Sequence, residues 1–144
     1  MSEVEKLGWL RRQLLIAGVL TFAVWDGAEI LAMTPGIAPG SHHLLYFTSM
    51  LFGASWLVCL GWLWIVLRRI KARPEVFAAL NDEMTIRNRW RASRVTMVVV
   101  MVCLMAGAGL ADYTHFSAAL ALAVLIWVVV VSKIGLYLWF ERSE

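Results

Sequence analysis

The hydrophobic positions of the chain fall into four long runs that are separated by polar segments. The runs cover residues 14–33, 44–67, 95–111 and 117–140. The hydrocarbon core of a bilayer is about 30 Å thick and is crossed by about 20 helical residues, with a range of about 17–25. Each run has such a length. The pattern therefore predicts an all-α, polytopic membrane protein, in which residues 1–144 form a single domain and four transmembrane helices make an antiparallel bundle.

The polar segment between the second and third runs predicts a helix of a different kind. Pro74 suits the first position of a helix. Phe77, Leu80 and Met84 recur at the spacing i, i+3 and i+7, as they would on one face of a helix. We therefore expect a short cytoplasmic amphipathic helix over about 75–92 that runs into the third span, with its apolar stripe in the membrane interface or against a partner.

Composition and charge strengthen the membrane interpretation and add an orientation. Hydrophobic residues make up 61% of the chain and charged residues only 16%, against roughly half and about a quarter in soluble domains. Lys and Arg occur before the first run, between the second and third runs and at the C-terminus, whereas the loops 34–43 and 112–115 contain none. The positive-inside rule then predicts that both termini and the long middle loop lie in the cytoplasm.

The tryptophans, like the basic residues, are concentrated on the predicted cytoplasmic side. Amphipathic aromatic rings favour the headgroup zone of a bilayer. Five of the eight tryptophans are expected near the cytoplasmic ends of the spans, namely Trp9, Trp62, Trp64, Trp90 and Trp139.

Two carboxylates interrupt the first run and are the first candidates for chemistry. Asp26 and Glu29 are three residues apart, which puts them on one face of a helix in the outer half of the membrane. Charged groups at such a depth are costly and often functional. We expect Asp26 to face the bundle interior and Glu29 to lie nearer water.

The remaining polar groups of the outer side suggest a proton or cation site. His42 and His43 lie in the first outer loop, and Asp112 and His115 lie in the second. Carboxylates and imidazoles together suit proton handling or a divalent cation. Any metal would be held by His43, His115 and Asp112. No metal-binding motif occurs, so no cofactor is predicted, and a purely structural role for these side chains stays open.

The middle loop carries the candidate surface for lipid or a partner. Arg87, Arg89 and Arg91 lie beside the apolar stripe of the predicted helix, where basic residues attract anionic lipid. The segment "LNDEMTIRNRWRASR", residues 80–94, resembles the D-E-x-basic-rich loop of small uncharacterised four-span bacterial inner-membrane proteins. The resemblance covers fifteen residues and implies a topology and a bacterial origin, but no activity.

Small residues predict self-association. Ser49 and Gly53 are four residues apart, and "AGAGLA" at 106–111 is a second small surface. Such surfaces allow helices to approach closely, within a bundle or between subunits. We expect a homo-oligomer in the lipid bilayer. A membrane-protein partner is also compatible with these surfaces, and no binding of nucleic acid is expected.

These observations favour one function class and leave a second open. No P-loop, HExxH or Ser-His-Asp pattern occurs. The sequence therefore favours a non-enzymatic binding, accessory or regulatory membrane protein. The alternative is a small cation- or proton-coupled membrane transporter that uses Asp26 and Glu29. An enzyme ranks third.

Overall fold

The computed structural model describes residues 3–36, 39–110 and 117–142, and these residues form helices and short links. The helices are α1 (Glu3–Met33), α2 (Pro39–Lys71), α3 (Pro74–Leu80), α4 (Glu83–Leu110) and α5 (Ala118–Arg142). The four long helices are long and apolar enough to cross a bilayer. At about 1.5 Å per residue even α5, with 25 residues, is about 37 Å long, more than the hydrocarbon thickness. The all-α class and the four transmembrane helices are confirmed, and the chain is a helical membrane protein.

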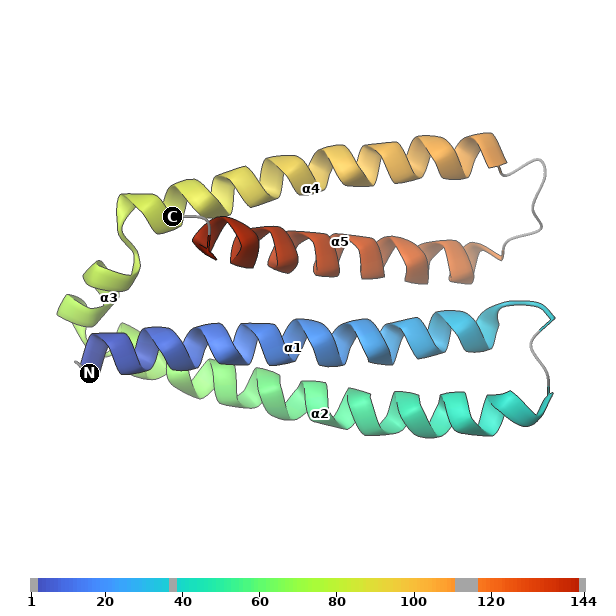
Figure 1. Ribbon diagram of the computed structural model, residues 1–144, viewed down its shortest axis with the longest axis horizontal. Coiled ribbons are helices and arrows are strands. Elements are labelled where there is room, and N and C mark those ends of the chain that lie inside the picture. Colours follow the sequence, from blue (N-terminus) through green and yellow to red (C-terminus); the bar gives the residue numbers. More distant parts are fainter. Residues whose placement is uncertain (1–2, 37–38, 111–116, 143–144) are drawn as a thin grey trace.

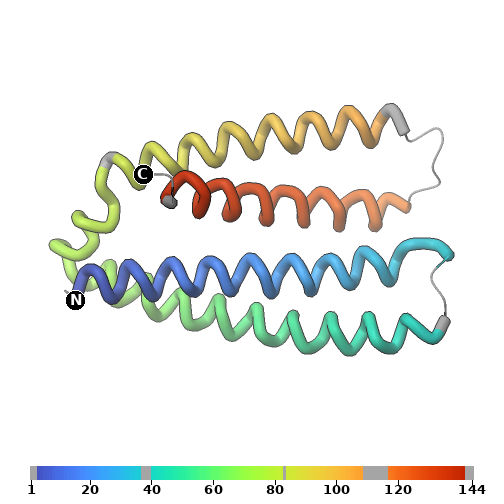
Figure 2. The backbone as a smooth tube through the Cα atoms, in the orientation of Figure 1, coloured from blue at the N-terminus to red at the C-terminus, as the bar shows by residue number. Residues whose placement is uncertain are grey.

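The long helices form two hairpins that lie side by side. Figure 1 shows them in the order α4, α5, α1, α2. Helix α1 packs against α2 and α5, and α5 packs against α4, whereas within the described ranges α2 and α4 make no extensive contact with each other. Both ends of the described chain lie at the same end of the bundle as α3 (Figures 1 and 2). We call this end the α3 end and the opposite one the loop end.

The segment between α2 and α4 corrects one expectation. A single helix over 75–92 was predicted, but the structure has a separate seven-residue α3 and begins α4 at Glu83. Asp82 causes the restart, because its Oδ1 accepts a hydrogen bond of 2.9 Å from the backbone N–H of Thr85, as an N-cap does. The same bond holds the pKa of the Asp82 carboxyl below its usual value. Arg87, Arg89 and Arg91 therefore belong to the first turns of a transmembrane helix.

Helix α3 packs onto the bundle by Val76 and Leu80, and the rest of the predicted apolar stripe faces outward. Val76 is buried together with Val66 and Ile70 of α2, and Leu80 packs against this cluster. Gly8 of α1 makes room for Leu80, since a Cβ there would lie 3.1 Å from the Leu80 Cδ2. Phe77 and Met84 of the predicted stripe are exposed. An ion pair between Glu3 and Arg73 adds a tie to the start of α1.

The small residues of α2 serve the contact with α1. The Ser49 hydroxyl donates a hydrogen bond of 2.9 Å to Glu29 Oε1. Gly53 lies against the indole of Trp25, and a Cβ at this glycine would come within 3.2 Å of the Trp25 Nε1. This surface is therefore used inside the bundle and is not free for another subunit. Self-association stays a prediction and now depends on the second small surface, of which residues 106–108 are exposed.

Candidate functional site

A buried arginine organises the α3 end of the bundle. Arg11 is only 7% exposed. Its guanidinium donates to the Tyr137 hydroxyl over 3.0 Å and lies 3.3 Å from Glu141 Oε1, with which it forms an ion pair. It also reaches the carbonyl of Leu80, the last residue of α3, over 3.5 Å. One side chain thus joins α1, α3 and α5.

Beside this arginine lies a cavity of about 370 Å³, which we call the basic cavity. Each long helix contributes to it a pair of residues four positions apart, which is about 6 Å or one helical turn. The pairs are Arg11 and Leu15 of α1, Leu67 and Leu63 of α2, Arg89 and Ser93 of α4, and Tyr137 and Lys133 of α5. In each pair the first residue lies nearer the α3 end. The basic cavity is therefore one helical turn deep and is shared by both hairpins.

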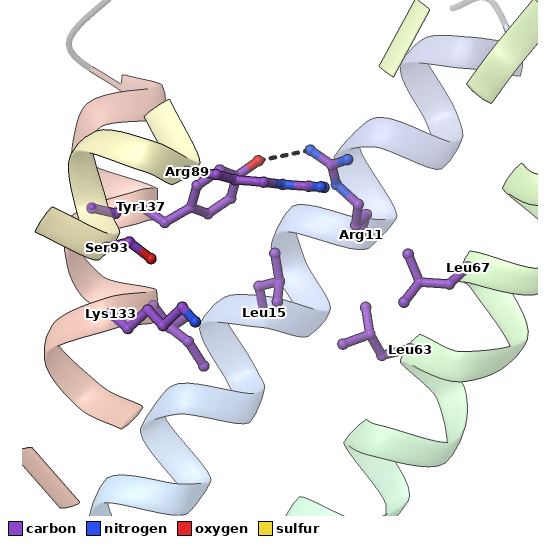
Figure 3. Close-up of a pocket in the computed structure, with 10 residues that line it drawn as sticks. Arg11, Leu15, Leu63, Leu67, Arg89, Ser93, Lys133 and Tyr137 are labelled. Carbon is purple, nitrogen blue, oxygen red and sulfur yellow. Dashed lines mark hydrogen bonds between the residues drawn. The ribbon is translucent and has the colours of Figure 1, made fainter. Parts of the chain in front are cut away.

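The charges of the basic cavity do not cancel. Figure 3 shows Arg89 and Lys133 extending from α4 and α5 toward α1, with Arg11 on the opposite side. Glu141 neutralises Arg11. In the part of the chain that the structure describes, neither Arg89 nor Lys133 forms an ion pair with a carboxylate. The arrangement leaves two positive charges facing an open cavity, which is the chemistry of an anion site.

Arg87, Arg89 and Arg91, which were predicted to act together, lie on two different faces of α4. Arg89 and Ser93 are four residues apart and both line the basic cavity. Arg87, Arg91 and Arg94 are spaced i, i+4 and i+7 and share another face of α4. All four arginines are exposed to the surroundings of this chain. Only Arg89 belongs to the cavity, and the other three are placed to meet headgroups or solvent.

The acidic pair lies in the loop-end half of α1, and Glu29 faces α2. Glu29 Oε1 accepts two hydrogen bonds, one of 2.8 Å from Trp25 Nε1 and one of 2.9 Å from Ser49. Asp26 differs, because its Oδ2 is buried and has no hydrogen-bond partner among the described residues. The two carboxylates predicted as one site therefore have different surroundings, and Glu29 is held by the bundle.

The histidines and the second outer loop are only partly described. His42 and His43 lie in the first turns of α2, where His42 is partly buried and His43 is exposed. Asp112 and His115 lie outside the described residues. Over the ranges that the structure does describe, no three His, Cys, Asp or Glu side chains form a group able to hold a metal ion. The site predicted at His43, His115 and Asp112 stays a prediction.

Comparison of the chain with protein-family models, with curated proteins and with solved structures finds no match.

Sequence reasoning missed the basic cavity, although a signal for it was present. Lys133 was the one basic residue deep in the fourth apolar run, and Tyr137 follows it by one helical turn. Arg89 and Ser93 have the same spacing. A search for polar pairs at i and i+4 at the basic ends of the spans finds both pairs. It does not reveal that they meet, since this depends on how the two hairpins pack.

Proposed function

We propose that the chain is a non-enzymatic membrane-embedded binding protein that holds an anionic ligand in the basic cavity. The observation that carries the proposal is the pair of cationic side chains, Arg89 and Lys133, that face one cavity without a carboxylate partner among the described residues. Unpaired charges beside hydrocarbon are costly, and an anion offsets that cost. The Ser93 and Tyr137 hydroxyls supply neutral hydrogen-bond groups beside them.

We also propose an orientation, in which the α3 end lies in the cytoplasm of a bacterial cell and the chain lies in the inner membrane. The support is the distribution of Lys and Arg, which are absent from the two loops at the loop end. Reporter fusions at positions 40 and 114 are expected to give a periplasmic signal, and one at position 80 a cytoplasmic signal. A periplasmic signal at position 80 would reverse the orientation.

Ligand binding is tested with dodecyl phosphate, a soluble anionic amphiphile, added to the protein in uncharged maltoside micelles. We expect saturable binding by calorimetry. Each cationic side chain near an anionic group contributes about 1 kcal/mol, which is about a fivefold change in affinity. Arg89→Gln combined with Lys133→Gln should therefore weaken binding by roughly 25-fold.

The matched control is Arg91→Gln, because Arg91 is an exposed arginine of the same helix that does not line the basic cavity. This variant should bind dodecyl phosphate as the unaltered protein does. Circular dichroism checks that every variant is folded. Equal loss of affinity in Arg91→Gln and in the double variant would show that surface charge alone attracts the probe, and would reject the proposal.

A transporter remains the second candidate, and one observation favours it. The buried Oδ2 of Asp26 lacks a hydrogen-bond partner among the described residues, which suits a carboxyl group that exchanges a proton or a cation. In proteoliposomes with a pH gradient, Asp26→Asn is expected to abolish cation flux while Glu29→Gln, which keeps an oxygen acceptor for Trp25 and Ser49, retains the fold. Unchanged flux in Asp26→Asn, or no flux in the unaltered protein, removes this candidate.

A further inference from the structure

We infer that the ligand of the basic cavity is a membrane phospholipid, whose phosphate lies between Arg89 and Lys133 and whose acyl chains lie along the leucines of α1 and α2. This inference rests on the proposed anion-binding function and names the class of ligand. The chemistry shared with a free phosphate ion is the phosphate group itself. Three observations favour the lipid.

The first observation is the depth of the basic cavity. The apolar run of α1 begins at residue 14, so Arg11 lies about 4.5 Å beyond its end, and Leu15 lies just inside it. Trp9, Trp90 and Trp139 surround the same end of the bundle and are each more than half exposed. Exposed tryptophans of membrane proteins gather at the headgroup level. The mouth of the basic cavity therefore lies where lipid phosphates lie.

The second observation is the arrangement of the donors over one helical turn. Lys133 and Ser93 lie about 6 Å deeper than Tyr137 and Arg89, on the hydrocarbon side. A free phosphate ion that reaches this depth gives up its water and gains nothing apolar. A lipid phosphate between the two levels meets Arg89 on one side and Lys133 on the other, while its chains lie along the leucines of the cavity.

The third observation is the apolar wall of the basic cavity. Leu15, Leu63 and Leu67 form one wall of the cavity. This wall belongs to α1 and α2, and Leu15 and Leu63 form its hydrocarbon-side part. A chain lying along Leu63 continues into the surrounding lipid. Basic pockets between transmembrane helices on the cytoplasmic side are known to hold anionic headgroups.

The experiment is displacement of bound dodecyl phosphate in maltoside micelles by three competitors. They are dioleoyl phosphatidylglycerol, dioleoyl phosphatidylcholine and inorganic phosphate. We expect phosphatidylglycerol to displace the probe at concentrations at least about tenfold below those needed for phosphatidylcholine, because only the former keeps a net negative charge for the two cations. Inorganic phosphate should compete more weakly than phosphatidylglycerol, since it lacks the chains.

Two variants separate the headgroup from the chain. Leu63→Trp places a larger side chain in the apolar wall and so narrows the cavity. It should weaken the binding of phosphatidylglycerol several-fold more than the binding of inorganic phosphate. Arg89→Gln should weaken both alike. Displacement by inorganic phosphate at concentrations as low as those of phosphatidylglycerol, or equal effects of Leu63→Trp on the two, would overturn the lipid inference while leaving anion binding intact. Absence of dodecyl phosphate binding would instead remove the proposed function.

Discussion

Replacing Arg11 with methionine is expected to lower the free energy of unfolding by about 3 kcal/mol, because it leaves the partly buried Glu141 carboxylate without its cation and removes three hydrogen bonds. Arg11 bonds to Tyr137, Glu141 and the Leu80 carbonyl from a position that is 7% exposed. Methionine replaces the apolar stem of the side chain and removes the charge and the donors. Equilibrium unfolding in mixed micelles of maltoside and dodecyl sulfate measures the change.

Arg12 provides the matched control for this prediction. It is the neighbouring arginine of α1 and forms no ion pair with the described residues. Arg12→Met should change the free energy of unfolding by less than about 0.5 kcal/mol. Adding Glu141→Gln to Arg11→Met should recover part of the loss, since the second change removes the stranded charge. Equal costs for the two arginines, or no recovery, would contradict a buried ion pair.

Replacing Trp25 with alanine is expected to cost about 3 kcal/mol of unfolding free energy, in the range observed for large aromatic side chains in packed interiors. The side chain of Trp25 extends from α1 and packs against α2. Its ring centroid is 5.9 Å from that of Phe22 and 5.1 Å from that of Trp56. Its indole also covers Gly53 and donates to Glu29. Alanine removes these contacts and leaves a space that the helix backbones close only in part.

Two substitutions divide this effect into its parts. Trp25→Phe keeps a ring and loses the indole N–H, so it should cost about 1 kcal/mol. Trp9→Ala removes an exposed indole at the headgroup level and should cost less than Trp25→Ala. The same mixed-micelle unfolding measures all three. A Trp25→Ala variant that is no less stable than Trp9→Ala would show that the aromatic cluster does not hold the first hairpin together.

The spans could be predicted because length and hydropathy are decided by the bilayer, not by the partner of each helix. The bilayer demands about 20 apolar residues whatever the packing, and the four runs meet that demand. The positions of the tryptophans could be predicted for the same reason, because the bilayer favours their rings at the headgroup level. Trp9, Trp62, Trp64, Trp90 and Trp139 are all exposed, as expected of rings that meet headgroups.

The break between α3 and α4 could not be read from apolar spacing, because Phe77, Leu80 and Met84 fit one helix as well as two. The side chain of Asp82 decides the matter, because it accepts a hydrogen bond from the Thr85 N–H and so caps a new helix that begins at Glu83. The candidate site depends on tertiary packing to a greater degree. Arg89 and Lys133 are 44 positions apart in sequence, and nothing in the local pattern of either tells that both face one cavity. Glu29 was recognised as unusual, but its two donors were not.

The ion pair between Arg11 and Glu141 also imposes an order on biogenesis. The two residues are 130 positions apart, so Arg11 enters the membrane long before its counterion has been synthesised. The first hairpin and α3 already share a cluster around Val66, Ile70 and Val76, and membrane helices associate after they have inserted. Until α5 arrives, the guanidinium of Arg11 has to remain among the headgroups and water. Docking of the last helix is therefore the step that draws this charge inside, and a chain truncated before α5 should have a folded first hairpin whose Arg11 is still open to anionic lipid.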